Sequence, residues 1–232
     1  LVNIVTSLGA VLLPRTSYYV EMKMEREFCT VSGKALEFVA VLSIPLTVSF
    51  TIMAKQCILL LSGNAYLPSV IPMCIIMPTL ILIGASNVFG VQMLVPLGKE
   101  TIVLYSECAG AVADIILNAV FIPRYGASGA AFGTLVAEAV VLVVQAAALK
   151  NMVWEIIKKV EVWKILPAAA LSGAAMIFIK NKVNMPVFPV LVICFSVFFG
   201  IYGILLLGMK ERILMELLRT AAKRLKQKER EE

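Results

Sequence analysis

The sequence contains no histidine, and none of its five cysteines belongs to a C-x-x-C pair. Histidine and cysteine are the usual zinc ligands, so no metal-binding residue is predicted. The missing imidazoles also remove the commonest general base of enzymes. The acidic residues of the loops alternate with basic ones and are expected to be solvated. These absences indicate a protein that is not an enzyme and that needs no cofactor.

Charge is also scarce. Charged residues make up 16% of the 232 residues and hydrophobic residues 60%, whereas soluble domains have about 25% and about 45–50%. A chain of this length cannot bury so much apolar surface in one core, so lipid is expected to solvate the remainder. The net charge of +6 does not indicate nucleic acid, because the basic residues lie between apolar runs and in the C-terminal tail.

Apolar runs of membrane-spanning length predict an all-α integral membrane protein with about six complete transmembrane helices and the end of a preceding one. The predicted spans are 35–61, 69–97, 101–122, 127–149, 165–179 and 183–209. The first run, 1–13, is expected to stop at Pro14 and to be the end of a helix that begins before this sequence. Pro45, Pro72 and Pro78 are expected to kink the helices that contain them.

The distribution of lysine and arginine predicts the orientation. One alternate set of loops, together with the C-terminal tail, holds 17 of the 21 basic residues, and the other set holds 4. Basic residues concentrate in cytoplasmic loops, so the first set and the C-terminus are expected in the cytoplasm. The chain is therefore expected to be a multi-pass protein of a prokaryotic plasma membrane, with membrane lipids around it.

Two stretches of the cytoplasmic set are amphipathic. In residues 150–164, Trp154 and Trp163 flank apolar and basic residues, a composition typical of a helix at the membrane interface. The tail, 210–232, repeats leucine and isoleucine at helical spacing beside basic residues. It is expected either to lie on anionic lipid or to be a solvated helix without a partner.

Glu37 and Lys55 lie near the two ends of the run 35–61, and the charged residues farther inside the apolar runs are all acidic: Glu107, Asp114 and Glu138. At 1.5 Å per residue, Asp114 and Glu138 lie roughly 12 and 16 Å from the outer ends of consecutive helices, close to the middle of the bilayer. Asn118 shares a helix face with Asp114, and Gln145 shares one with Glu138. A carboxylate at this depth is costly and usually faces a cavity or a partner.

These polar residues allow two interpretations. They could line a cavity that binds substrate and a coupling cation or proton, with Asp114, Glu138, Asn118 and Gln145 as the candidate residues. Asn87 and Gln92 of the preceding span are weaker candidates for the same cavity. Alternatively, the side chains hold helices together by hydrogen bonds, a common use of polar groups in membranes. Gly129 and Gly133 form a G-x-x-x-G pattern that permits close helix contact.

Three stretches carry a family resemblance. They read Val-Leu-Leu-Pro-Arg-Thr-Ser from Val11, Leu-Ser-Gly-Asn-Ala-Tyr from Leu61, and Gly-Val-Gln-Met-Leu-Val-Pro-Leu-Gly-Lys-Glu from Gly90, the last continued by the run from Asn118 to Glu138. Together they resemble the Wzx-type oligosaccharide flippases, the polysaccharide-export branch of the multidrug/oligosaccharidyl-lipid/polysaccharide (MATE-like) superfamily. The resemblance covers nearly the whole chain.

The resemblance implies a C-terminal bundle of a 14-helix transporter. Residues 1–149 would be the transport bundle from the end of helix 8 to helix 12, and 150–164 a cytoplasmic interfacial loop. Residues 165–209 would be two accessory spans, and 210–232 a basic cytoplasmic tail. The implied partners are the N-terminal half of the same protein and a lipid-linked oligosaccharide substrate.

The implied activity is translocation of undecaprenyl-pyrophosphate-linked repeat units by alternating access. Alternatives are a multidrug or cation exporter, a peptidoglycan-precursor flippase, or a membrane scaffold for polysaccharide synthesis that does not transport. A pyrophosphate cavity needs cations, and the predicted helices contain no Lys or Arg apart from Lys55 near the outer end of 35–61. Those cations are expected from the other half, or from Lys55 and Arg124.

Overall fold

A computed structural model of the chain describes residues 1–158, 160–183, 185–213 and 215, and this part contains no strand. Five of its helices are long and apolar enough to cross a membrane, and a bent pair of segments makes up a sixth candidate span. The five are α2 (Glu25–Ile52), α6 (Glu100–Tyr125), α7 (Ala127–Leu149), α9 (Val162–Lys182) and α10 (Val187–Gly208). The all-α membrane class is therefore confirmed.

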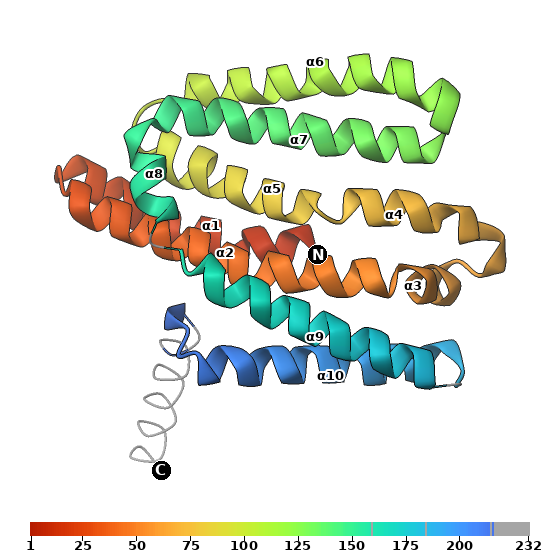
Figure 1. Cartoon of the computed structure of the whole chain (residues 1–232). Coiled ribbons are helices and arrows are strands. Elements are labelled where there is room, and N and C mark those ends of the chain that lie inside the picture. Colours follow the sequence, from red (N-terminus) through yellow and green to blue (C-terminus); the bar gives the residue numbers. More distant parts are fainter. Residues whose placement is uncertain (159, 184, 214, 216–232) are drawn as a thin grey trace, which may run out of the picture.

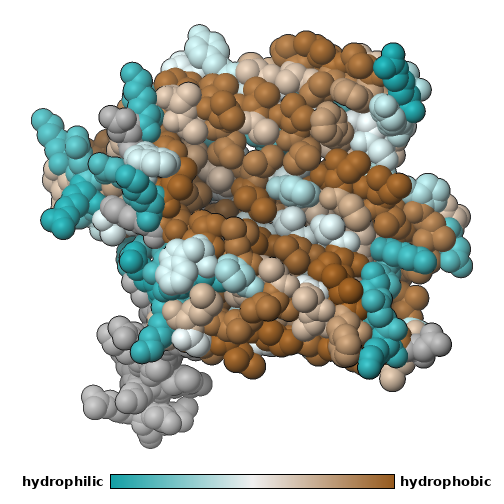
Figure 2. All heavy atoms as spheres, viewed as in Figure 1, coloured by the Kyte–Doolittle hydropathy of each residue, from teal (hydrophilic) through white to brown (hydrophobic). Residues whose placement is uncertain are grey.

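The spans lie side by side in a row (Figure 1). From one edge to the other the order is α6, α7, the bent span, α2 with α1 (Val2–Glu21), α9 and α10. Apolar side chains cover the middle of the face shown in Figure 2, and hydrophilic residues gather at the two ends of the bundle. This surface has the apolar band that a bilayer requires.

The end of α1 and the beginning of α2 differ from the prediction. Helix α1 continues through Pro14 to Glu21, and α2 begins at Glu25 rather than at residue 35. Proline removes one backbone donor, which the surrounding packing can offset, so it did not end the helix. The prediction that the helices contain no Lys or Arg apart from Lys55 is consequently wrong, because Arg15 lies inside α1 and Lys34 inside α2.

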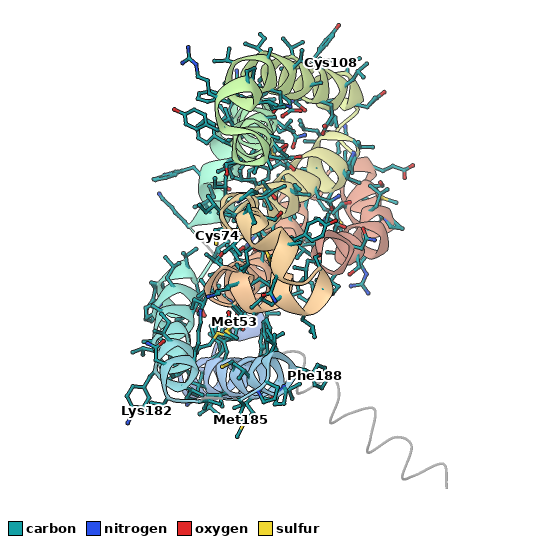
Figure 3. All side chains as sticks on the ribbon, turned by 90° about the vertical axis from the view of Figure 1, so that its right-hand side faces the viewer. Met53, Cys74, Cys108, Lys182, Met185 and Phe188 are labelled. Carbon is teal, nitrogen blue, oxygen red and sulfur yellow. The ribbon has the colours of Figure 1, made fainter. Side chains whose placement is uncertain are left out.

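The predicted span 35–61 is interrupted. Helix α2 ends at Ile52, and α3 (Ala54–Leu61) follows after the fully buried Met53. Figure 3 shows Met53 between the α2–α3 segment and the α9–α10 pair. Its side chain packs in an apolar cluster with Met176, Cys194 and Phe198, which holds the break against the last two spans.

The predicted span 69–97 is the bent one. A 3-10 turn, η1 (Asn64–Ser69), leads into α4 (Val70–Ile76). After a break at Met77 and Pro78, α5 (Thr79–Asn87) continues the span, bent by 41°. The kink expected at Pro78 is thus present. The span ends in a π-helix, η2 (Val88–Leu94), a rare form often found at functional sites.

The remaining spans match the prediction closely. Helix α7 has the predicted bounds, and α6, α9 and α10 each contain or nearly coincide with a predicted run. A short helix, α8 (Asn151–Ile157), forms within the predicted interfacial stretch and runs across the end of the bundle (Figure 1). The predicted tail helix, 210–232, lies almost entirely outside the described residues.

Candidate functional site

The candidate site lies on the hairpin of α6 and α7, whose helices touch along a seam of glycines. A methyl group added at Gly110 would lie 2.5 Å from Cγ2 of Val141, and one added at Gly133 would lie 2.5 Å from Oδ1 of Asn118. Gly129 lies against the backbone of Phe121 in the same way. The G-x-x-x-G pattern therefore does permit close contact, and it presses α7 against the polar face of α6.

A groove of about 210 Å³ runs beside this seam. Three carboxylates line it, from Glu107 and Asp114 of α6 and Glu138 of α7, together with Thr134 and the small residues Gly110, Ala111 and Ala137. Asp114 and Glu138 are half-buried, and Glu107 is exposed. The structure therefore brings Asp114 and Glu138 into one groove at the edge of the bundle.

Asp114 and Asn118 each present an oxygen atom with no hydrogen-bond partner among the described residues. Both Oδ1 atoms are buried. Both lie against Gly133, at 3.3 Å and 2.5 Å from the position of a β-carbon there. Buried acceptors normally have a donor, so this pair of oxygens suits a proton or a small cation.

The groove is also electrostatically uncompensated. Within the described part of the chain, none of Glu107, Asp114 and Glu138 forms an ion pair. Oxygen atoms, carboxylate oxygens above all, are the ligands that hard cations prefer. The groove supplies three carboxylates and the hydroxyl of Thr134, and the amide oxygen of Asn118 lies beside Asp114 against Gly133. Such a site can bind a proton or a metal cation without any catalytic chemistry.

Gln145 lies away from the groove, although its spacing along the helix put it on the Glu138 stripe. Its side chain is 1% exposed, and its Nε2 donates a hydrogen bond of 3.0 Å to Oγ of Ser106. The same amide lies against Gly90 of the π-helix, where an added methyl group would be 3.0 Å from Nε2. Its Oε1 has no partner among the described residues. Gln145 thus joins α6, α7 and η2.

Asn87 and Gln92 do not line the groove either. Asn87 is the last residue of α5 and is half-buried. Gln92 is buried within η2, and its Oε1 also lacks a partner in the described region. Of the six candidate residues, Asp114 and Glu138 therefore line the groove together, and Asn118 lies next to Asp114 against Gly133.

A second group of carboxylates was missed by sequence reasoning. Ligand atoms of Glu37, Glu161 and Glu211 lie within 4.8 Å of one another, with Glu37 and Glu211 fully buried. Lys164 pairs with Glu161 at 2.6 Å. The three residues come from α2, the segment before α9 and the segment after α10, so no spacing in the sequence could have indicated their proximity.

The two basic residues expected to bind a pyrophosphate, Lys55 and Arg124, lie outside the groove. Lys55 is exposed on α3, and Arg124 is exposed in the last turn of α6. Comparison of the chain with family models, curated proteins and solved structures finds no match. The resemblance to Wzx-type flippases therefore stays a prediction.

Proposed function

We propose that this chain is one bundle of a membrane flippase that moves undecaprenyl-pyrophosphate-linked oligosaccharides, driven by a cation or proton bound in the α6–α7 groove. The observation that carries the transport part is the trio of Glu107, Asp114 and Glu138 on membrane-length helices. Carboxylates in this position cannot face hydrocarbon without a penalty of ~2.5–3.5 kcal/mol each on insertion scales. They therefore face water or another part of the transporter.

The exposure of α6 supports a second bundle. Only 11% of the residues in its most apolar stretch are buried, and the groove lies between α6 and α7, the two spans at this edge of the row. In the proposal, the N-terminal half of the transporter faces this edge, and the central cavity lies between the two halves. The cations for the pyrophosphate then belong to that half.

The substrate class follows from the resemblance. The matching run from Asn118 to Glu138 covers the turn of the α6–α7 hairpin, and it includes Thr134 and Glu138 of the groove and Gly129 and Gly133 of the seam. The proposal places the end with α8 in the cytoplasm of a prokaryotic cell, in accordance with the basic residues counted above.

The groove suggests how ion binding could drive alternating access. An empty groove carries uncompensated charge and favours the conformation that keeps it hydrated. A bound proton or cation neutralises part of this charge, so the conformation that covers the groove becomes accessible. A ligand shifts such an equilibrium only through its different affinity for the two states, and Asp114 with Asn118 supplies that difference.

The test is glycan export in a flippase-null strain that carries the full-length protein. Asp114→Asn and Glu138→Gln should each cut flipping about tenfold or more, equivalent to ~1.4 kcal/mol in the barrier, at unchanged abundance. Glu155→Gln on the exposed surface of α8 is the matched control. Normal export by both variants and by the double variant would refute the coupling role and favour structural hydrogen bonding or the scaffold. Dye efflux that depends on Asp114, without glycan export, would point to a multidrug exporter.

A further inference from the structure

Six of the described residues have a positive φ, the left-handed region of the backbone. Their residue type differs between the two ends of the bundle. At the end opposite α8, the two are glycines, Gly63 and Gly126. At the α8 end, three of the four are lysines: Lys23, Lys150 and Lys210. Glycine adopts a positive φ without steric cost and lysine does not, so the lysines call for a separate reason.

The lysines occupy positions where glycine is the usual residue. After α1, Lys23 N–H bonds to the carbonyl of Val20, and the next N–H bonds to that of Tyr19. This pattern defines a Schellman motif, whose left-handed residue is typically glycine. The end of η2 has the same pattern with Gly98 in that place. A glycine therefore fits this motif at the same end of the bundle.

Lys150 shows the same preference in a different turn. It separates α7 from α8 with φ 48° and ψ −121°, close to the φ 55° and ψ −130° of Gly126 at the other end of α7. This region of backbone space is dominated by glycine in type II′ turns. Lys150 and Lys23 are both exposed, and within the described residues neither forms an ion pair.

A pocket lies where these span ends meet. Its volume is about 240 Å³, and it is lined mainly by apolar side chains, among them Tyr19, Phe28, Leu97 and Met152. Lys23 and Glu25 complete the lining, and Lys150 precedes Met152 by two residues. The pocket thus combines apolar walls with the ammonium group of Lys23 and the carboxylate of Glu25, and Lys150 lies outside its lining, in the turn that leads to Met152.

The neighbouring helix α8 has the character of a membrane interface. Ile156 points into the core and is fully buried, whereas Trp154 is 63% exposed. The ammonium group of Lys158 lies 4.9 Å from the centre of the Trp154 ring. Exposed tryptophan beside lysine is typical of the headgroup level, which puts the pocket at the same depth.

We propose that this pocket binds one anionic phospholipid of the adjoining leaflet. The ammonium groups of Lys23 and Lys150 hold the phosphate, and the first carbons of an acyl chain lie against Tyr19, Phe28 and Met152. Glu25 favours a singly charged phosphodiester whose headgroup carries hydroxyl donors, as in phosphatidylglycerol. The lysines are kept in left-handed positions because the bound phosphate offsets their backbone cost. This inference does not depend on the transported substrate.

The test uses the full-length protein in nanodiscs of phosphatidylcholine alone or mixed with phosphatidylglycerol, with Tm and retained lipid by native mass spectrometry as readouts. The anionic lipid should raise the Tm of the unmodified protein. The double variant Lys23→Gly, Lys150→Gly should have a higher Tm than the unmodified protein in phosphatidylcholine, because glycine relaxes both turns. Phosphatidylglycerol should no longer raise the Tm of this variant. In native mass spectrometry the variant should retain one lipid fewer than the unmodified protein.

Two controls define the site. Lys23→Arg with Lys150→Arg should keep the response to phosphatidylglycerol. Lys182→Ala should also keep it, because Lys182 is another lysine beside an aromatic ring, Phe178, at the opposite end of the bundle (Figure 3). An unchanged lipid response in the glycine double variant would overturn the proposal. An equal rise in Tm from inorganic phosphate in neutral nanodiscs would also overturn it, since the site would then bind a free anion.

Discussion

Lys180 of α9 donates a hydrogen bond of 2.8 Å from its ammonium group to the carbonyl oxygen of Ile52, the last residue of α2. The break at Met53 frees this carbonyl from the helix, and the lysine satisfies it from a different span. The bond ties α9 to the α2–α3 junction at the end of the bundle opposite α8. Lys180, which hydropathy places at the end of a span, therefore stabilises the contact between α9 and the end of α2.

The first prediction concerns this bond. Lys180→Met should lower the free energy of unfolding by about 1 kcal/mol, because a half-buried carbonyl loses a charged donor. Lys182→Met is the matched control, since Lys182 lies over the Phe178 ring at 4.8 Å and forms no hydrogen bond in the described part of the chain. Denaturation in detergent measures both variants. Equal losses would show that only the positive charge at this end matters.

The second prediction concerns the glycine seam. Gly133→Ala should displace the Asn118 side chain, because the new methyl group would lie 2.5 Å from its Oδ1. We expect a stability loss of about 1–3 kcal/mol from overpacking, together with reduced transport.

Gly200→Ala is the control for this variant. Gly200 lies inside α10, and an added methyl group there meets no atom within 4 Å. Alanine should stabilise that helix by about 0.5–1 kcal/mol. Unaltered transport and stability of Gly133→Ala would contradict the tight contact that the structure assigns to α6 and α7.

The third prediction separates Gln145 from the groove. Gln145→Met should change stability by less than about 1 kcal/mol, because it removes one hydrogen bond and also a buried oxygen without a partner. Ser106 keeps its bond to the carbonyl of Val103. Since Gln145 does not line the groove, export should persist in the complementation assay. Loss of export with normal abundance would place Gln145 in the ion path.

The fourth prediction concerns orientation. In a cysteine-free variant of the full-length protein, Lys158→Cys should react with a membrane-impermeant maleimide only after permeabilisation of the cells. Arg124→Cys, at the other end of the bundle, should react in intact cells. The 17-to-4 distribution of basic residues motivates both expectations. Labelling of position 158 in intact cells would contradict this orientation and place the α8 end of the bundle outside the cell.

Much of this fold could be predicted from apolar length alone. The bounds of α7 are those of the apolar run between Gly126 and Lys150, because both residues adopt turn conformations that end a helix. The breaks were harder to foresee. Met53 and the π-helix η2 lie inside predicted membrane-length spans, and hydropathy carries no information about backbone geometry within such a span.

The site could be predicted only in part, for a similar reason. Asp114 and Glu138 lie on two antiparallel helices joined by one short turn, so their spacing predicts a similar depth and allows contact, and the structure brings both into one groove. Gln145 shares the face of Glu138 by spacing, yet it packs against Gly90. Helical spacing fixes a direction around one helix, whereas the neighbour met in that direction depends on tertiary packing.

The glycine seam has a mechanical consequence. Sliding of α6 along α7 would drive Val141 and Asn118 out of recesses that exist only opposite Gly110 and Gly133. The hairpin therefore moves as one stiff lever. Outside the hairpin, α6 packs chiefly on η2, whereas α7 packs on both α4 and α5, the two segments that meet at the bend between Ile76 and Thr79. A displacement of the carboxylates would thus be passed through α7 to both arms of the bent span.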